Sequence, residues 1–304
     1  DRTSQEVAWM STSHALKMKI APWALLAVSA SWGYAFVVMK DAIEKQSVNS
    51  FLFSRFAVAV IAMVALKPRV LSQLNRDIVK KGFLAGLFLG SGYLFQTLGL
   101  KLTGAAITGF ITGLYVVATP VIAAVFLRHK ISKLTWGCVA LATAGLALLS
   151  LHGWSVGFGE FLVLISAIGF GAHIIALSQW SKDLDSYTFT VIQLSTCALV
   201  TGIISFAQGY EAPKDTTGWL VVLYTAVICT AIAFMIQTWS QAHMTPTKVA
   251  VILTMEVVFA AIFALIFGGE TLTVQALVGG VLVVIAMFAI VVKGEEEVES
   301  THGN

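Results

Sequence analysis

The sequence predicts an all-α integral membrane protein with ten transmembrane helices in two inverted five-helix repeats, and three observations lead to this prediction. Hydrophobic residues make up 58% of the 304 residues and charged residues only 12%, with a mean hydropathy of +0.86. Soluble domains are usually about 45–50% apolar and about 25% charged. Apolar runs of bilayer-spanning length recur along the whole chain, and its two halves carry matching patterns.

Each apolar run is about 18–24 residues long, the length that a helix needs to cross a bilayer. The runs are continuous, whereas the strands of a membrane barrel alternate over about ten residues. The expected spans are 20–39, 48–66, 82–100, 105–127, 134–151, 157–177, 187–207, 218–239, 249–267 and 274–292.

The basic residues predict the orientation of these spans. If the amino terminus is inside, 14 lysines and arginines fall on inside segments and 4 on outside segments, and Arg55 lies within a span. Because cytoplasmic loops carry the excess of basic residues, both termini are expected in the cytoplasm. We therefore expect a multi-pass protein of the bacterial inner membrane.

The two halves are expected to be related repeats. "SASWGYAFVV" (29–38) and "SAIGFGAHII" (166–175) align without a gap, and each opens a set of five spans. Because five is odd, the second set enters the membrane from the opposite side, as in many secondary transporters with a substrate site at the midplane. The expected parts are a cytoplasmic tail at 1–19, repeats at 20–151 and 157–293, and a cytoplasmic tail at 294–304. Met10 is a candidate native start, so residues 1–13 are left out of the fold.

Four features carry a resemblance to a known family: "ASWGYAF" (30–36), Arg55, "GLYVVATPVIAAVFLRHKIS" (113–132) and "TPTKVAVILTMEVVFAAIFALIFGGETLT" (245–273). On these residues the chain resembles the EamA-type carriers of the drug/metabolite transporter superfamily, and among them the bacterial exporters of aromatic amino acids. It departs at Val257, where the family often has proline, and at His129, where an acid is usual. The resemblance covers 20–293 and implies a carrier.

Glu256 is the one acid deep within an expected span. A carboxylate there is expensive to bury, and intramembrane acids usually face a bundle interior or a wet cavity. Its side chain either titrates or contacts a cationic group of a substrate, or it is a structural group between helices. We expect its face, with Ile252 and Phe259 one turn away on either side, to look into a central cavity.

Further polar and aromatic residues are expected to line this cavity with Glu256: Trp32, Tyr93, Gln96, Thr112, Tyr115, His173 and Gln237. Structural alternatives remain for Trp32 and His173 as core residues, and for the Thr108–Thr112–Tyr115–Thr119 face as a seam between helices. Arg55 and Pro120 are expected to have gating or structural roles, because Arg55 lies near a span end and proline bends helices.

The motifs that the chain lacks exclude several classes of protein. It has no phosphate-binding Gly-x-x-x-x-Gly-Lys loop, no H-E-x-x-H zinc helix and no G-x-S-x-G nucleophile turn. We expect no catalytic residue, metal, cofactor, nucleotide or nucleic acid, and we expect only a small-molecule substrate and membrane lipid as partners, with a monomer sufficient for transport.

The resulting expectation is a secondary transporter that exports small amphipathic metabolites by alternating access. Amino acids with aromatic or apolar side chains are the expected substrates. One alternative is an efflux carrier for aromatic or quaternary ammonium cations, which rings and a carboxylate would bind. An intramembrane lipid-modifying enzyme is the alternative from another class.

Overall fold

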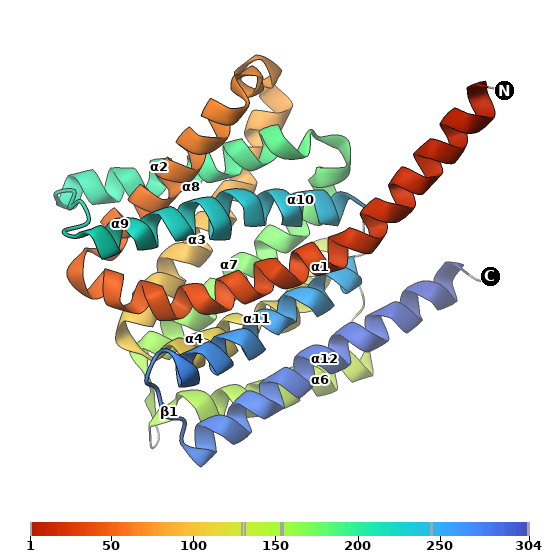
Figure 1. Cartoon of the computed structure of the whole chain (residues 1–304). Coiled ribbons are helices and arrows are strands. Elements are labelled where there is room, and N and C mark those ends of the chain that lie inside the picture. Colours follow the sequence, from red (N-terminus) through yellow and green to blue (C-terminus); the bar gives the residue numbers. More distant parts are fainter. Residues whose placement is uncertain (1, 129, 131, 153–154, 244–245, 303–304) are drawn as a thin grey trace.

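The computed structural model describes residues 2–128, 130, 132–152, 155–243 and 246–302, and these form a bundle of long helices (Figure 1). His129 and Thr245 of the sequence motifs lie outside the described residues. The elements of the first half are α1 (Arg2–Lys45), α2 (Val48–Leu66), η1 (Pro68–Gln73), α3 (Arg76–Leu102), α4 (Ala105–Thr112), α5 (Tyr115–Leu127) and α6 (Lys133–Ser150).

The second half begins with a two-residue antiparallel strand pair, β1 (Leu151–His152) and β2 (Ser155–Val156), and is otherwise helical. Its helices are α7 (Phe158–Trp180), η2 (Ser181–Asp183), α8 (Ser186–Gln208), α9 (Thr216–Leu223), η3 (Tyr224–Ile232), α10 (Ala233–His243), α11 (Pro246–Ile266) and α12 (Val274–His302).

Seven helices or helix pairs of the described residues are long and apolar enough to cross a membrane. Three shorter apolar stretches, Trp136–Leu149, Ile252–Ile266 and Val274–Ala289, lie within α6, α11 and α12. The expectation of an all-helical membrane protein is confirmed to this extent, and the count of ten spans stays a prediction. The backbone of α1 is already helical at Arg2, within the segment expected as a tail.

Polar side chains define where several helices begin. Asn75 accepts hydrogen bonds from the N–H groups of Asp77 and Ile78 in the first turn of α3. Asp185 and Asp215 do the same for α8 and α9. Such caps satisfy N–H groups that have no partner within the helix, and each is worth about 1 kcal/mol.

Close helix contacts place the cavity-forming helices. A Cβ atom on Gly82 would lie 2.6 Å from Ile192 of α8, so α3 can approach α8 only with glycine there. Gly33 brings α1 equally close to α11, where an added Cβ would lie 2.7 Å from the backbone nitrogen of Ala260. Gly82 therefore serves the close packing of α3 on α8. Helices α6 and α12 lie side by side along one edge of the bundle (Figure 1).

Two of the expected spans are interrupted rather than regular. The span at 105–127 breaks into α4 and α5 at Gly113 and Leu114, where the N–H of Val116 bonds to the Gly113 carbonyl three residues back. Pro120 was expected to mark the bend, but it lies inside α5, and the break precedes it. The tighter turn at Gly113 already leaves the regular hydrogen-bond pattern, so the interruption does not need the proline.

The second interruption is η3, a nine-residue π-helical segment between α9 and α10. Within it, the Thr230 hydroxyl donates to the carbonyl of Thr225, five residues back, at 2.6 Å. π-Helical turns are rare and are found frequently at functional sites. The continuous apolar run at 218–239 contained no signal for this segment.

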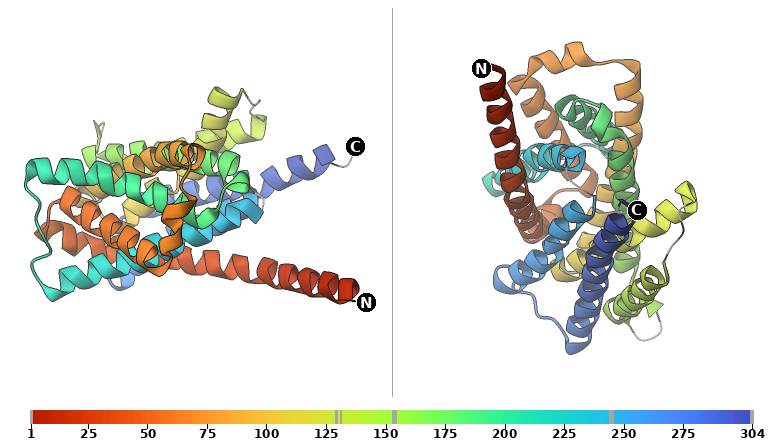
Figure 2. Two further views of the ribbon diagram at one scale, coloured as in Figure 1. Left: turned by 90° about the horizontal axis from the view of Figure 1, so that it is seen from above. Right: turned by 90° about the vertical axis from the view of Figure 1, so that its right-hand side faces the viewer.

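The first residues of α1 and the last residues of α12 project from the same end of the bundle (Figures 1 and 2). At the opposite end lie the turns at 46–47, 103–104, 209–215 and 267–273, which we call the turn end. Polar contacts connect the two halves there: Lys45 pairs with Asp215 at 3.2 Å, and Gln46 donates to the Glu211 carbonyl at 2.6 Å. These contacts therefore hold the two halves together at the turn end.

Candidate functional site

A cavity lies in the middle of the bundle, enclosed by α1, α2, α3, α4, α5, α7, α10 and α11. About 540 Å³ of space lies between its walls, counting the part open to solvent. Both halves of the chain contribute walls, so a ligand here would contact both.

All eight residues that the sequence predicts as substrate-binding lie in the wall of this one cavity: Trp32, Tyr93, Gln96, Thr112, Tyr115, His173, Gln237 and Glu256. Arg55, expected to be gating or structural, lies in the same wall, and Pro120 does not. The cavity thus brings together eight predicted residues from six of the expected spans.

Sequence analysis missed the apolar part of the wall, which consists of Ala35, Phe36, Met39, Phe170, Ile174, Phe234 and Leu253. Two signals could have found two of them, Phe36 and Phe234. Phe36 and His173 occupy equivalent positions in the aligned segments at 29–38 and 166–175, and both line the cavity. Phe234 lies one turn before Gln237 on the same helix and could have been found in that way.

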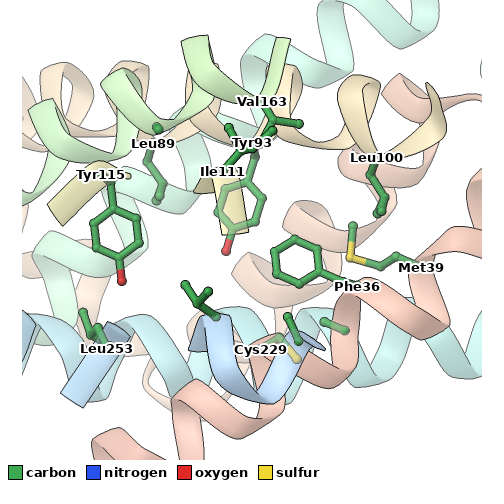
Figure 3. Close-up of a cluster of buried hydrophobic side chains, with 14 of the residues drawn as sticks. Phe36, Met39, Leu89, Tyr93, Leu100, Ile111, Tyr115, Val163, Cys229 and Leu253 are labelled. Atoms are coloured by element: carbon green, nitrogen blue, oxygen red, sulfur yellow. The ribbon is translucent and has the colours of Figure 1, made fainter. Parts of the chain in front are cut away.

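Aromatic rings form a connected group around the cavity. The ring of Tyr93 makes edge contacts with Phe56 and Phe170 at 5.3 Å between centroids, and with Phe234 at 6.0 Å. Trp32 lies 5.4 Å from Phe234. Such spacings are typical of favourable ring pairs, which add about 0.5–1.5 kcal/mol to area burial. In Figure 3 the hydroxyl ends of Tyr93 and Tyr115 point toward the side on which Leu253 and Cys229 lie.

The π-helical segment holds the indole of Trp32. Its Nε1–H donates to the backbone carbonyl of Cys229 at 2.7 Å. Tyr224 of the same segment donates through its hydroxyl to the carbonyl of Ser31 at 2.8 Å, beside Trp32 in α1. These bonds fix the ring of Trp32 as a rigid wall of the cavity.

Three hydrogen-bonded pairs hold the polar side chains of the wall. Gln96 donates to Thr112 at 3.2 Å, the ring Nε2 of His173 lies 2.7 Å from the Gln193 amide oxygen, and Gln237 donates to Gln241 at 3.0 Å. The pair with Gln193 is the structural role that was the alternative for His173. Each pair orients a polar group that also borders the cavity.

Two buried polar atoms of the wall have no hydrogen-bond partner among the described residues, namely the Tyr115 hydroxyl and the side-chain oxygen of Gln237. Buried polar atoms are almost always paired, and an unpaired one needs an explanation. The other members of the predicted threonine face differ, because Thr108 and Thr119 bond to carbonyls one turn back in their own helices.

Glu256 is 6% exposed and borders the cavity from α11. Among the described residues its carboxylate has neither a hydrogen bond nor an ion pair within 4 Å. We expected Ile252 and Phe259 to share the cavity face of Glu256, and this prediction was wrong. The residue that shares this face is Leu253. Phe259 instead packs against Gly33 and stacks on Phe263. The close packing of α1 on α11 rotates Phe259 away from the cavity.

Arg55 of α2 is 1% exposed and is the second charged residue of the wall. Its Nε donates to Thr230 at 2.7 Å, and Nη2 donates to the Tyr93 hydroxyl at 3.3 Å. The guanidinium carbon lies 4.6 Å from the centre of the Tyr93 ring. The cavity therefore carries one guanidinium and one carboxylate that are not paired with each other.

Apolar helices around a central cavity of rings and isolated polar groups are the architecture of a membrane transporter. The model of the EamA-like transporter family matches the chain twice, at residues 19–151 and 157–292. The chain therefore belongs to the EamA-like transporter family, whose members are transporters rather than enzymes.

Comparison with known proteins supports this membership. An uncharacterized transporter of Archaeoglobus fulgidus is 31% identical over 277 residues, covering 90% of this chain and 87% of the relative. The pseudopaline exporter of Pseudomonas aeruginosa is 23% identical over 275 residues, covering 88% and 94% of the two chains. A crystal structure described only as that of a protein has a TM-score of 0.62 at 15% identity, over 89% of this chain and 96% of its own, which shows the fold alone.

Proposed function

We propose that this chain is a secondary transporter of the bacterial inner membrane that exports amino acids with aromatic or apolar side chains by alternating access. One observation carries the proposal: a central cavity whose wall combines aromatic rings with buried polar groups that lack partners. Within a protein, such groups are expensive to leave unpaired. A polar ligand that enters the cavity and bonds to them removes this cost.

The composition of the wall supports an amphipathic ligand. Trp32, Phe170 and Phe234 offer an apolar surface to a side chain. The Tyr115 hydroxyl and the Gln237 side-chain oxygen offer hydrogen bonds to polar groups. The carboxylate of Glu256 offers a partner for an ammonium group. An amino acid carries its side chain and its ammonium group on the same carbon, so one molecule can use all these contacts.

Alternating access rests on the two halves. Each half matches the family model separately, and equivalent residues Phe36 and His173 line the cavity. We propose that residues 20–151 and 157–293 are inverted five-helix repeats, so that the chain has ten spans. With both termini in the cytoplasm, the turn end, where contacts hold the halves together, faces the periplasm, and substrate enters from the cytoplasm, as export requires.

The cavity lies within a single chain, so a monomer is sufficient for this mechanism. The relationship to a metabolite exporter supports outward transport, because the pseudopaline exporter matches nearly its whole length.

Efflux of aromatic or quaternary ammonium cations is the second candidate function. It is favoured by the unpaired carboxylate of Glu256 next to a wall of rings, since rings and carboxylates both attract cations. Arg55 in the same wall counts against it, because a second cation would be repelled.

Transport by the purified protein in proteoliposomes tests the proposal. The panel contains labelled phenylalanine, tyrosine, tryptophan and leucine, with tetraethylammonium as the cation probe. Saturable movement of the aromatic amino acids, chemically unchanged, is the expected result. Movement of tetraethylammonium without movement of amino acids would favour the second candidate, and movement of none of the probes would refute the amino acid assignment.

A further inference from the structure

Arg55 is a buried cation without an anionic partner. Among the described residues, no aspartate or glutamate lies within 4 Å of its guanidinium. Its recorded acceptors are the Thr230 hydroxyl, the Tyr93 hydroxyl and, at 3.5 Å, the sulfur of Met39. These groups are all uncharged, and a thioether is a weak acceptor. A guanidinium in this state is more costly to bury than one paired with a carboxylate.

The guanidinium also has donors to spare. It carries five N–H groups, of which the recorded bonds use three. The two that remain are one on Nη1 and one on Nη2, and these two nitrogens can together bind a carboxylate with two parallel bonds. Because Arg55 borders the cavity, a ligand there can reach these donors.

The protein holds this group in one orientation. The guanidinium carbon lies over the Tyr93 ring, and its Nε is fixed by Thr230. Thr230 accepts this bond in a defined direction, because its own proton goes to the Thr225 carbonyl in the π-helical segment. A preformed donor fork binds an anion with little loss of conformational entropy.

We propose that Arg55 is the carboxylate subsite of the cavity. The inference rests on the proposed function and extends it: the substrate must carry a carboxylate, and Glu256 binds the ammonium group at a separate place in the same wall. Simple amines and quaternary cations leave the fork of Arg55 empty. The substrate class is therefore compounds with a free carboxylate, amino acids above all, and Arg55 selects them against the corresponding amides and amines.

The test compares acids with their own amides. Thermal unfolding of the purified protein is measured with phenylalanine, phenylalaninamide, benzoate and benzamide, each titrated to obtain an apparent Kd. In the wild-type protein each acid should bind about tenfold or more tightly than its amide, because a charge-assisted bond is lost in the amide. In Arg55→Gln this preference should disappear, because binding of the acids weakens by about tenfold or more relative to binding of their amides.

Arg55→Lys is the second variant, because it keeps a buried charge and removes the fork. It should fold as the wild type does and should retain only part of the acid preference. Glu256→Gln is the matched control, since it removes the other charge of the wall. It should leave the preference for benzoate over benzamide unchanged.

Two results would overturn the assignment of Arg55 as the carboxylate subsite. One is a wild-type protein that binds acid and amide equally. The other is an acid preference that survives in both Arg55 variants, since the carboxylate would then bind elsewhere. This binding measurement does not depend on transport. Failure of the proposed function would instead appear as an absence of phenylalanine transport in proteoliposomes while the acid preference of the wild type remains.

Discussion

The carboxylate of Glu270, in the loop between α11 and α12, accepts a hydrogen bond from the backbone N–H of Ala105 at 2.6 Å. It also accepts one from Ala106 at 3.1 Å, so an acid from the second half caps α4 of the first half. The residue at the cap position itself is Gly104, which has no side chain to do this. An anion at a helix N-terminus satisfies free N–H groups and interacts favourably with the helix dipole.

We predict that Glu270→Ala lowers the free energy of unfolding by about 1 kcal/mol, the usual value of a helix cap. Glu270→Gln should lose less, because its amide oxygen still accepts one bond. Thermal unfolding in detergent measures both. Asp77→Ala is the control, since this exposed acid pairs with Lys81 one helical turn away, and such pairs contribute about 0.3–0.5 kcal/mol. Equal losses for Glu270→Ala and Asp77→Ala would argue against a cap between the halves.

A second prediction concerns Lys40, which holds the other side of the same turn. Its ammonium group donates to the carbonyls of Leu100 and Thr103 at the end of α3. Because Lys40 and Glu270 brace the two helix ends that meet at residues 103–104, their effects should not be additive. We expect a coupling energy of at least about 0.5 kcal/mol in a double-mutant cycle of Lys40→Met and Glu270→Gln. Additive losses would show that the two helix ends respond independently.

Tyr115→Phe separates binding from stability. The hydroxyl that it removes has no partner among the described residues, so the variant should be as stable as the wild type or slightly more stable. Transport of the substrate should nevertheless fall, because a hydrogen bond to the ligand is lost. Tyr187→Phe is the matched control: its hydroxyl donates to the Met63 carbonyl at 2.6 Å, so it should cost about 1 kcal/mol of stability. A normal transport rate in Tyr115→Phe would remove this residue from the site.

Glu256→Gln tests whether the carboxylate takes part in transport. Only the ionised carboxylate attracts an ammonium group, so transport by the wild type should decline as the pH falls and the acid becomes protonated. The variant keeps the size and hydrogen bonding of the side chain and should fold, but its rate should be lower and should no longer decline with acid. Rates of amino acid uptake into proteoliposomes across a pH series measure this. If both the rate and the pH profile match the wild type, the carboxylate is a structural group.

Topology can be tested by cysteine labelling. We predict that a cysteine at Lys214, an exposed residue at the turn end, reacts with a membrane-impermeant reagent added to intact cells from outside. A cysteine at Arg76, at the start of α3, should react only after the membrane is opened. Gln46 also lies at the turn end, but a cysteine there would not be accessible to the reagent because Gln46 is buried against Glu211. The opposite labelling pattern would reverse the orientation and make the turn end cytoplasmic.

The sequence alone determined the helical membrane class, the family resemblance and the polar residues of the cavity. The physical reason is that polar groups are expensive within apolar spans, so Glu256, Gln96 and Gln237 stand out wherever the chain places them. A run of apolar residues long enough to span a bilayer is likewise readable without any knowledge of neighbouring helices.

Tertiary structure decided what depends on contacts between distant segments. Met39 and Phe170 resemble any apolar residue of a span, and only the packing of the helices turns them toward the cavity. The break in the span at 105–127 lies at Gly113 and Leu114, before Pro120, where local hydrogen bonding is irregular. Glu270 caps a helix 165 residues away in the sequence. The hydrogen-bond partner of Arg55 Nε is Thr230 of the π-helical segment and not an acidic residue. Hydrogen bonds between residues this far apart in sequence exist only once the two halves pack together, so no pattern within one span predicts them.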